Sequence, residues 1–261
     1  MNIYISSTMN KDFNEVVKYA AQNNVSIEIS RFGSLKTLDR EYEDRKEFYK
    51  KALKNFPGKV TLHGFFYDIA PSANEIEVLS LTKKRYQQSF EIARATKAHT
   101  IVFHPCYNPL IKHYDYEREY FKNQIEFYKN YIKDLESENI TAVLENTFEY
   151  APESTLQIIE GVNSKNLKAC LDLGHANINS PMPVNDWVEQ LGDKLVHVHM
   201  HNNYGDADNH LSVLNGTIDI KGFLDKLKEK NLNPNIVLEI FTQQEIDESL
   251  DYLKKYEEIN V

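Results

Sequence analysis

The feature that most constrains the fold of this sequence is a regular alternation of short apolar runs with longer segments of helical spacing. The apolar runs are rich in β-branched and aliphatic residues and cover 3–6, 25–29, 60–62, 100–103, 141–144, 167–171, 196–200 and 236–238. The helical segments between and after them cover 11–23, 41–54, 75–97, 116–138, 152–162, 185–192, 220–230 and 243–257. Eight strands that each precede a helix predict an α/β fold, a closed (β/α)8 TIM barrel, with an open doubly wound sheet as the alternative.

The composition supports one folded unit without a membrane segment. The 261 residues contain no Pro-, Gly- or Ser-rich linker, so we expect a single barrel domain over residues 1–261. Only two cysteines are present, Cys106 and Cys170, which argues against a disulfide scaffold. The apolar runs are far shorter than the ~18 residues that span a bilayer, and the first residues lack a secretion signal. We therefore expect a cytoplasmic protein with no membrane partner.

The charge of the chain restricts its partners. Thirty Lys and Arg against 39 Asp and Glu give a formal net charge of −9, which opposes non-specific binding to nucleic acids. The nine glycines form neither a Gly-x-Gly-x-x-Gly nor a Gly-x-x-x-x-Gly-Lys motif, so the sequence shows no nucleotide-binding loop. These observations favour a small-molecule substrate.

Polar side chains with metal-binding chemistry stand where the predicted strands end. The strand-end residues, in chain order, are His63, His104, Glu145, Asp172, His199 and Glu239, while His175, Asp208 and His210 follow in adjoining segments. Because the carboxyl ends of barrel strands converge on one mouth, we expect all nine side chains to lie together. Imidazole and carboxylate groups are ligands for zinc, manganese or iron, and clustered carboxylates without a cation repel one another. The sequence therefore predicts a divalent-metal site.

Other residues near these strand ends have less specific interpretations. We expect His197 to alternate with His199 across its strand and to point outward with a structural role, whereas His201 is ambiguous. The aromatic residues at 65–67 either pack in the core or line the mouth. Asn146 is a candidate hydrogen-bonding neighbour of the site, and Cys106 is interpreted as an unreactive thiol.

The ordered series of motifs resembles the xylose isomerase-like TIM-barrel superfamily, which includes tagatose-type sugar epimerases, inosose-processing enzymes and endonuclease IV. The resemblance runs over nearly the whole chain. It rests on His63-Gly64, Phe103-His104-Pro105, Leu144-Glu145-Asn146, the segment 170–176 (CLDLGHA), His199-Met200-His201-Asn202, Asp208-Asn209-His210 and Leu238-Glu239.

For epimerase-type members, the resemblance implies one divalent ion at Glu145, Asp172, His199 and Glu239, with both glutamates moving a proton and His175 assisting. For endonuclease IV, it implies three zinc ions held by nine ligands. All nine have counterparts here, at His63, His104, Glu145, Asp172, His175, His199, Asp208, His210 and Glu239.

The chain departs from endonuclease IV in the segments expected to enter DNA. It has Tyr4-Ile5-Ser6-Ser7 and Ser30-Arg31-Phe32-Gly33 in place of that enzyme's first-strand and second-loop motifs. A Leu-Gly-Glu-Gly motif is replaced by Val213-Leu214-Asn215-Gly216, which puts the geometry around Asp208 and His210 in doubt.

These features leave three functional hypotheses. The favoured one is a metal-dependent isomerase or epimerase of a small sugar or sugar phosphate, with one to three Zn²⁺ or Mn²⁺ ions. The alternative is a trinuclear zinc phosphodiester hydrolase that acts on abasic DNA, and only there is DNA a partner. A metal-dependent binding protein without turnover is the third.

Overall fold

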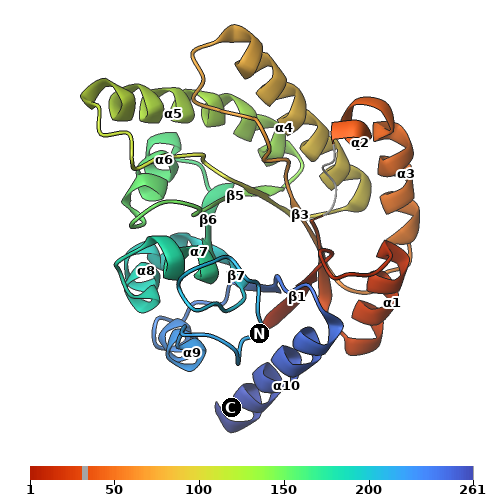
Figure 1. Ribbon diagram of the computed structural model, residues 1–261. Helices are drawn as coiled ribbons and strands as arrows, with labels where there is room; N and C mark the ends of the chain where they lie inside the picture. The colour runs from red at the N-terminus through yellow and green to blue at the C-terminus, as the bar shows by residue number, and fades with distance from the viewer. Residues whose placement is uncertain (31–34, 261) are drawn as a thin grey trace.

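A computed structural model of the chain describes residues 1–30 and 35–260, so Arg31, Phe32 and Gly33 of the second-loop comparison lie outside the described residues. Within these ranges the strands form a closed, all-parallel barrel in the order β1 to β8 (Figure 1). Their bounds are Asn2–Ser6, Ser26–Ile29, Val60–His63, Thr100–Phe103, Thr141–Glu145, Leu167–Asp172, Leu195–Met200 and Asn235–Leu238.

The pairing of the first and last strands distinguishes a barrel from an open sheet. Residues Asn2 to Ile5 of β1 pair with Asn235 to Leu238 of β8 in parallel register. The predicted TIM barrel is therefore confirmed, and the doubly wound alternative is wrong.

Helices surround the barrel on its outside (Figure 1). The α-helices α1 to α10 are Phe13–Asn23, Leu35–Arg40, Tyr42–Ala52, Ile76–Thr96, Tyr114–Ser137, Glu153–Val162, Leu173–Asn179, Val184–Leu191, Ile220–Glu229 and Gln243–Asn260, and a 3-10 turn, η1, covers Gly192–Lys194. Local signals set some of these limits. Asp12 and Glu15 form a capping box at the start of α1, and Asn24 ends it in the left-handed conformation with φ 54°. Among the described residues, no helix has the length and apolar character needed to cross a membrane.

Alternate residues of each strand face two different cores. In β4, Phe103 faces the helices and stacks on Tyr86 of α4 with ring centroids 4.1 Å apart. Val102 faces the barrel interior, where it packs with Val143 and Cys170 in a small cluster separate from the main core. The parity that turns Val102 inward also turns His104 toward the barrel axis, so the strand geometry positions the residues at the mouth.

Candidate metal centre

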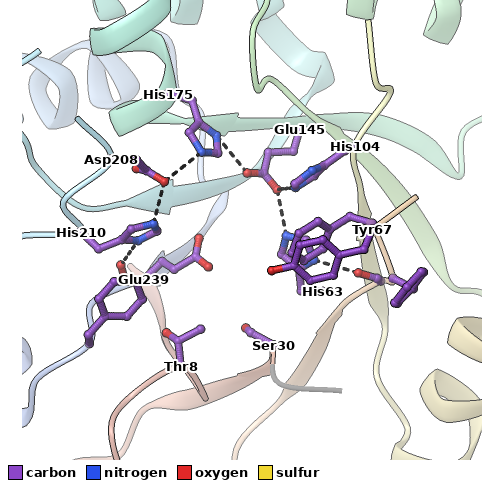
Figure 2. A pocket seen from close by; sticks show the side chains of 14 residues that line it. Thr8, Ser30, His63, Tyr67, His104, Glu145, His175, Asp208, His210 and Glu239 are labelled. Atoms are coloured by element: carbon purple, nitrogen blue, oxygen red, sulfur yellow. Dashed lines mark hydrogen bonds and ion pairs between the residues drawn. The ribbon is translucent and has the colours of Figure 1, made fainter. Parts of the chain in front are cut away.

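The nine side chains predicted as metal ligands converge at the carboxyl end of the barrel, as shown in part in Figure 2. Seven of them line a cavity of about 620 Å³, together with Thr8, Ser30, Phe241 and the aromatic segment 65–67. The other two, Asp172 and His199, are fully buried. The structure thus brings together donors from six consecutive strands, from α7 and from the β7–α9 loop.

A first group of donors surrounds one oxygen of Glu145. Its Oε2 atom lies 3.2 Å from His63 Nε2 and 3.2 Å from His104 Nε2. Glu145 ends β5, and the two histidines end or follow the neighbouring strands β3 and β4. One carboxylate oxygen thus lies close to two imidazole nitrogens, and both are donor types that bind divalent cations.

A second group surrounds the Nδ1 atom of His199. Glu239 Oε2 lies 3.2 Å from this nitrogen, Glu145 Oε1 lies 3.4 Å from it and Asp172 Oδ2 lies 3.7 Å from it. Three carboxylates and one imidazole therefore point at a common volume. Glu145 belongs to both groups, one oxygen to each.

A third group is centred on Asp208 in the loop after β7. Asp208 Oδ2 lies 3.0 Å from His210 Nε2 and 3.4 Å from His175 Nε2. Figure 2 shows this group beside Glu145, whose Oε1 is 3.3 Å from His175 Nδ1. The different sequence at 213–216, Val213-Leu214-Asn215-Gly216, has thus not separated Asp208 from His210.

Backbone carbonyls orient three of the imidazoles. His63, His175 and His210 each place Nδ1 against a main-chain oxygen, which assigns the ring proton to Nδ1 and leaves the Nε2 lone pair free for a ligand. The accepting carbonyls, 2.7 to 3.0 Å away, belong to Gly64, Asn146 and Glu239. Histidines that bind metals in proteins usually have such a partner on the other nitrogen.

Several buried polar atoms of the cluster have no hydrogen-bond partner among the described residues. They are His104 Nε2, His199 Nδ1 and Glu145 Oε2, and all three are directed at the donor groups above. A buried polar atom without a partner costs about 1–3 kcal/mol, so several such atoms directed at one place are an arrangement that a bound cation would satisfy. The chemistry of these donors fits a divalent cation of the zinc or manganese type.

Without a cation, protons on the imidazoles offset the clustered carboxylates. Burial acts to raise the pKa of Glu145, but the imidazoles of His199 and His104 hold that pKa well below its ordinary value. Burial acts to lower the pKa of His63, but the adjacent Glu145 carboxylate raises it to about 9. Burial likewise acts to lower the pKa of His210, but the adjacent Asp208 carboxylate raises it to about 9.

The prediction for His197 is wrong, because residues two apart in a strand share a face. His197 points into the barrel like His199, is fully buried, and places Nε2 2.9 Å from Glu28 Oε2. The strand register agrees with this inward position, because His197 pairs with Cys170, which lies in the barrel interior. Leu195 pairs with Ala169, so β7 has a bulge between Leu195 and His197. The ambiguous His201 is also buried, with Nε2 3.2 Å from Asp172 Oδ2.

The remaining sequence interpretations concern neighbours of the cluster. Asn146 links the ends of β5 and β6, since its side chain donates to the Asp172 carbonyl and accepts from the Asp172 N–H. Phe66 stacks on His104 with centroids 4.8 Å apart, so this part of the segment 65–67 does line the mouth. Burial raises the pKa of Cys106 to about 11, which agrees with an unreactive thiol.

Sequence reasoning missed two residues next to the cluster. Phe241 lies against His210 with ring centroids 4.5 Å apart and lines the cavity. Glu28 lies on β2, below the centre, and contacts both His197 and His199. The signal for Glu28 was present, because an acidic residue within the four-residue apolar strand Ser26–Ile29 requires a buried partner.

A closed parallel barrel with imidazoles and carboxylates at its carboxyl mouth defines a TIM-barrel protein with a candidate metal centre. The chain belongs to the xylose isomerase-like TIM barrel family, whose profile matches residues 25–256.

Individual relatives agree with this assignment. An uncharacterized protein of Methanocaldococcus jannaschii is 30% identical over 208 residues, which are 77% of this chain and 71% of that one. The crystal structure of a D-tagatose 3-epimerase-like protein is 27% identical, covers 99% of this chain and 98% of its own, and has a TM-score of 0.84. A Thermus thermophilus protein soaked with zinc chloride is 20% identical, with a TM-score of 0.78 and 98% of both chains covered, and shows the shared fold.

Proposed function

We propose that the protein is a divalent-metal-dependent isomerase or epimerase that acts on a small sugar or sugar phosphate. The observation that carries the proposal is the convergence of Glu145 and Glu239 on His199 Nδ1, at 3.4 and 3.2 Å, at the base of a cavity of about 620 Å³. The likeness to a D-tagatose 3-epimerase-like protein supports the same class of substrate.

In this proposal Glu145, Asp172, His199 and Glu239 hold one divalent cation. The bound cation supplies Lewis acidity, which polarises a substrate carbonyl and makes the neighbouring C–H acidic. Glu239 lines the cavity and takes the proton from carbon onto a carboxylate oxygen, and Glu145 gives the carbon a second proton that it receives from His175, after which the proton on Glu239 leaves to solvent and His175 regains one. His175, between Glu145 and Asp208, assists by keeping a proton near Glu145 Oε1. The aromatic rings of Phe66 and Phe241 exclude water from the reacting carbon.

Incorporation of solvent deuterium tests the proton transfer. Wild-type protein saturated with Mn²⁺ should exchange deuterium into the carbon next to the carbonyl of a ketose or ketose phosphate, detected by NMR. Glu239→Gln should lower the exchange rate by about 10²–10⁴-fold, because proton transfer by a positioned carboxylate contributes that much. Bound metal is measured in both proteins, so that loss of the ion is separated from loss of the base.

The matched control is Asp206→Asn, which removes one carboxylate from an exposed position in the same mouth loop. It should leave the exchange rate within about twofold of wild type, because exposed charges act weakly through solvent. If the metal-loaded wild-type protein incorporates deuterium into none of the ketoses in a broad panel, the proposal is wrong.

A second candidate function is a trinuclear zinc phosphodiester hydrolase. The geometry that favours it is the donor surplus, since a mononuclear epimerase does not need the His63–His104 group or the Asp208–His210 group. Clustered zinc ions stabilise both the attacking and the leaving oxygen of a phosphodiester. DNA with an abasic site is the substrate in this case.

Metal counting together with a cleavage assay separates the two functions. Three zinc ions per chain by elemental analysis, together with incision of an abasic oligonucleotide, would replace the epimerase proposal. One tightly bound ion per chain, no incision of the oligonucleotide and deuterium exchange into a sugar would support the epimerase proposal. Stoichiometric metal with neither activity indicates a metal-dependent binding protein.

A further inference from the structure

A charged network lies in the barrel interior directly below the candidate metal centre. Its central residue is Glu28 of β2, which is fully buried. Glu28 Oε2 accepts a hydrogen bond from Thr61 Oγ1 at 3.0 Å and lies 2.9 Å from His197 Nε2. Glu28 Oε1 lies 3.0 Å from His199 Nε2. A buried carboxylate is costly unless it is paired, so its position here requires an explanation.

His199 is oriented differently from the other imidazoles of the centre. His63, His175 and His210 direct Nε2 to the donor groups and place Nδ1 against a main-chain carbonyl. His199 directs Nδ1 to the donor groups and places Nε2 against a carboxylate. His199 thus has the carboxylate of Glu28 behind it where the other three rings have a main-chain carbonyl.

The network assigns the ring protons. Asn235 Nδ2 lies 3.5 Å from His197 Nδ1, and an amide N–H₂ donates, so Nδ1 of His197 accepts and its proton is on Nε2. His197 therefore donates to Glu28 Oε2, which also accepts from Thr61. Glu28 Oε1 is the oxygen that faces His199 Nε2, at 3.0 Å, and because a carboxylate only accepts, a proton on Nε2 is the arrangement that this ion pair favours.

We infer that Glu28 is a positioning residue, which holds His199 as the Nε2–H tautomer with the Nδ1 lone pair directed at the metal. The inference rests on the metal assignment of the proposed function and deepens it. A carboxylate behind a metal-binding imidazole fixes the ring orientation and raises the basicity of the ligand nitrogen. Glu28 acts through His199, whose ring lies between it and the donor groups.

The comparison of two conservative variants tests this role. Glu28→Gln keeps the shape of the side chain and removes its charge, whereas Thr61→Val keeps the shape of Thr61 and removes the bond to the other oxygen of the same carboxylate. Affinity for Co²⁺ is measured by competition with a chelator, and the visible spectrum of bound Co²⁺ reports its ligands. Glu28→Gln should weaken binding about 10–100-fold and change the spectrum, and Thr61→Val should stay within about threefold of wild type with an unchanged spectrum.

Equal affinities for wild type and Glu28→Gln would overturn the inference, as would equal losses in the two variants. If wild type binds no Co²⁺, the metal assignment fails as well, which distinguishes that result from a failure of Glu28 alone.

If Glu28→Gln does not fold, the wild-type protein gives the answer. Two-bond ¹H–¹⁵N spectra of ¹⁵N-histidine-labelled protein are recorded with and without Zn²⁺, and His199→Gln identifies the signals. A proton on Nε2 of His199 and a zinc-shifted Nδ1 support the inference, and the reverse assignment excludes it.

Discussion

The imidazole rings of the candidate metal centre are positioned by the groups that contact the ring nitrogen facing away from the donor groups. Carbonyl oxygens hold the rings of His63, His175 and His210, and a carboxylate holds His199. The space around the rings is equally restricted. A Cβ atom added at Gly174 would lie 1.9 Å from His201 Cε1, far inside contact distance, so the residue at 174 must lack a side chain for His201 to occupy its buried position.

Gly174→Ala should therefore destabilise the protein by about 1–3 kcal/mol, because His201 must move from its contact with Asp172. Urea unfolding followed by circular dichroism measures the change.

Gly161→Ala in α6 is the control, since the three atoms nearest to its added Cβ all belong to the side chain of Ile125, which is only partly buried and can shift. The control should change stability by about 0.5 kcal/mol or less, because Ala also favours the helix. Similar losses in the two variants would show that His201 does not set the requirement at Gly174.

The sequence was sufficient to locate a side chain where its position follows from the end of a strand. Six of the nine expected donors follow from strand ends that converge in any closed parallel barrel, the other three follow in adjoining segments, and the structure brings all nine together. Sequence reasoning failed at His197, where the alternation of the strand was misapplied, and at Glu28, whose partners on β7 are remote in sequence. A contact between β2 and β7 across the interior depends on the closed barrel and is not visible in local patterns.

At the scale of elements, the predicted strands agree closely with the observed ones, whereas the short helices α2 and α7 were not predicted. Short helices bury too few residues to produce a periodic pattern in the sequence. The start of α7 is instead fixed by Asp172, whose side chain accepts a hydrogen bond from the His175 N–H at 2.7 Å. The long helices are held by aromatic contacts with the barrel. Phe103 of β4 stacks on Tyr86 of α4 and also meets Tyr131 of α5 edge-on.

Phe103→Ala should cost about 3–5 kcal/mol, because it leaves a cavity where β4 meets two helices. The free energy of unfolding from urea titration checks this value. Phe148→Ala is the control, since Phe148 is 61% exposed, and it should change stability by less than about 0.5 kcal/mol. Comparable effects of the two substitutions would mean that the stacking on Tyr86 does not hold α4 to the barrel.

At the scale of the whole molecule, we expect the buried charges to make stability depend on pH and on the proposed cation. The pKa of His63 and the pKa of His210 are raised from 6.5 to about 9, as burial is outweighed by Glu145 and by Asp208 respectively. A raised folded-state pKa adds stability that is fully present below pH 6.5 and is lost as the pH rises through 9. A cation needs the neutral imidazoles, so its binding displaces these protons.

The melting temperature of metal-free protein, measured by calorimetry in a chelator, should therefore fall between pH 6.5 and pH 9. The increase in melting temperature caused by excess Zn²⁺ should be larger at pH 9 than at pH 6.5, because fewer protons compete with the metal. A metal-free melting temperature that rises over this interval would contradict the assignment of the raised pKa values to these histidines.

The four residues proposed to hold the cation lie on, or directly after, four strands that are consecutive around the barrel, from β5 to β8. A cation bound there acts as a cross-link between segments that are remote along the chain, and it closes loops that the backbone alone leaves open. Local opening of any one of these strands would then require release of the ion. Amide hydrogens in β5 to β8 should consequently exchange with solvent in a concerted manner when the ion is bound, and strand by strand after chelation.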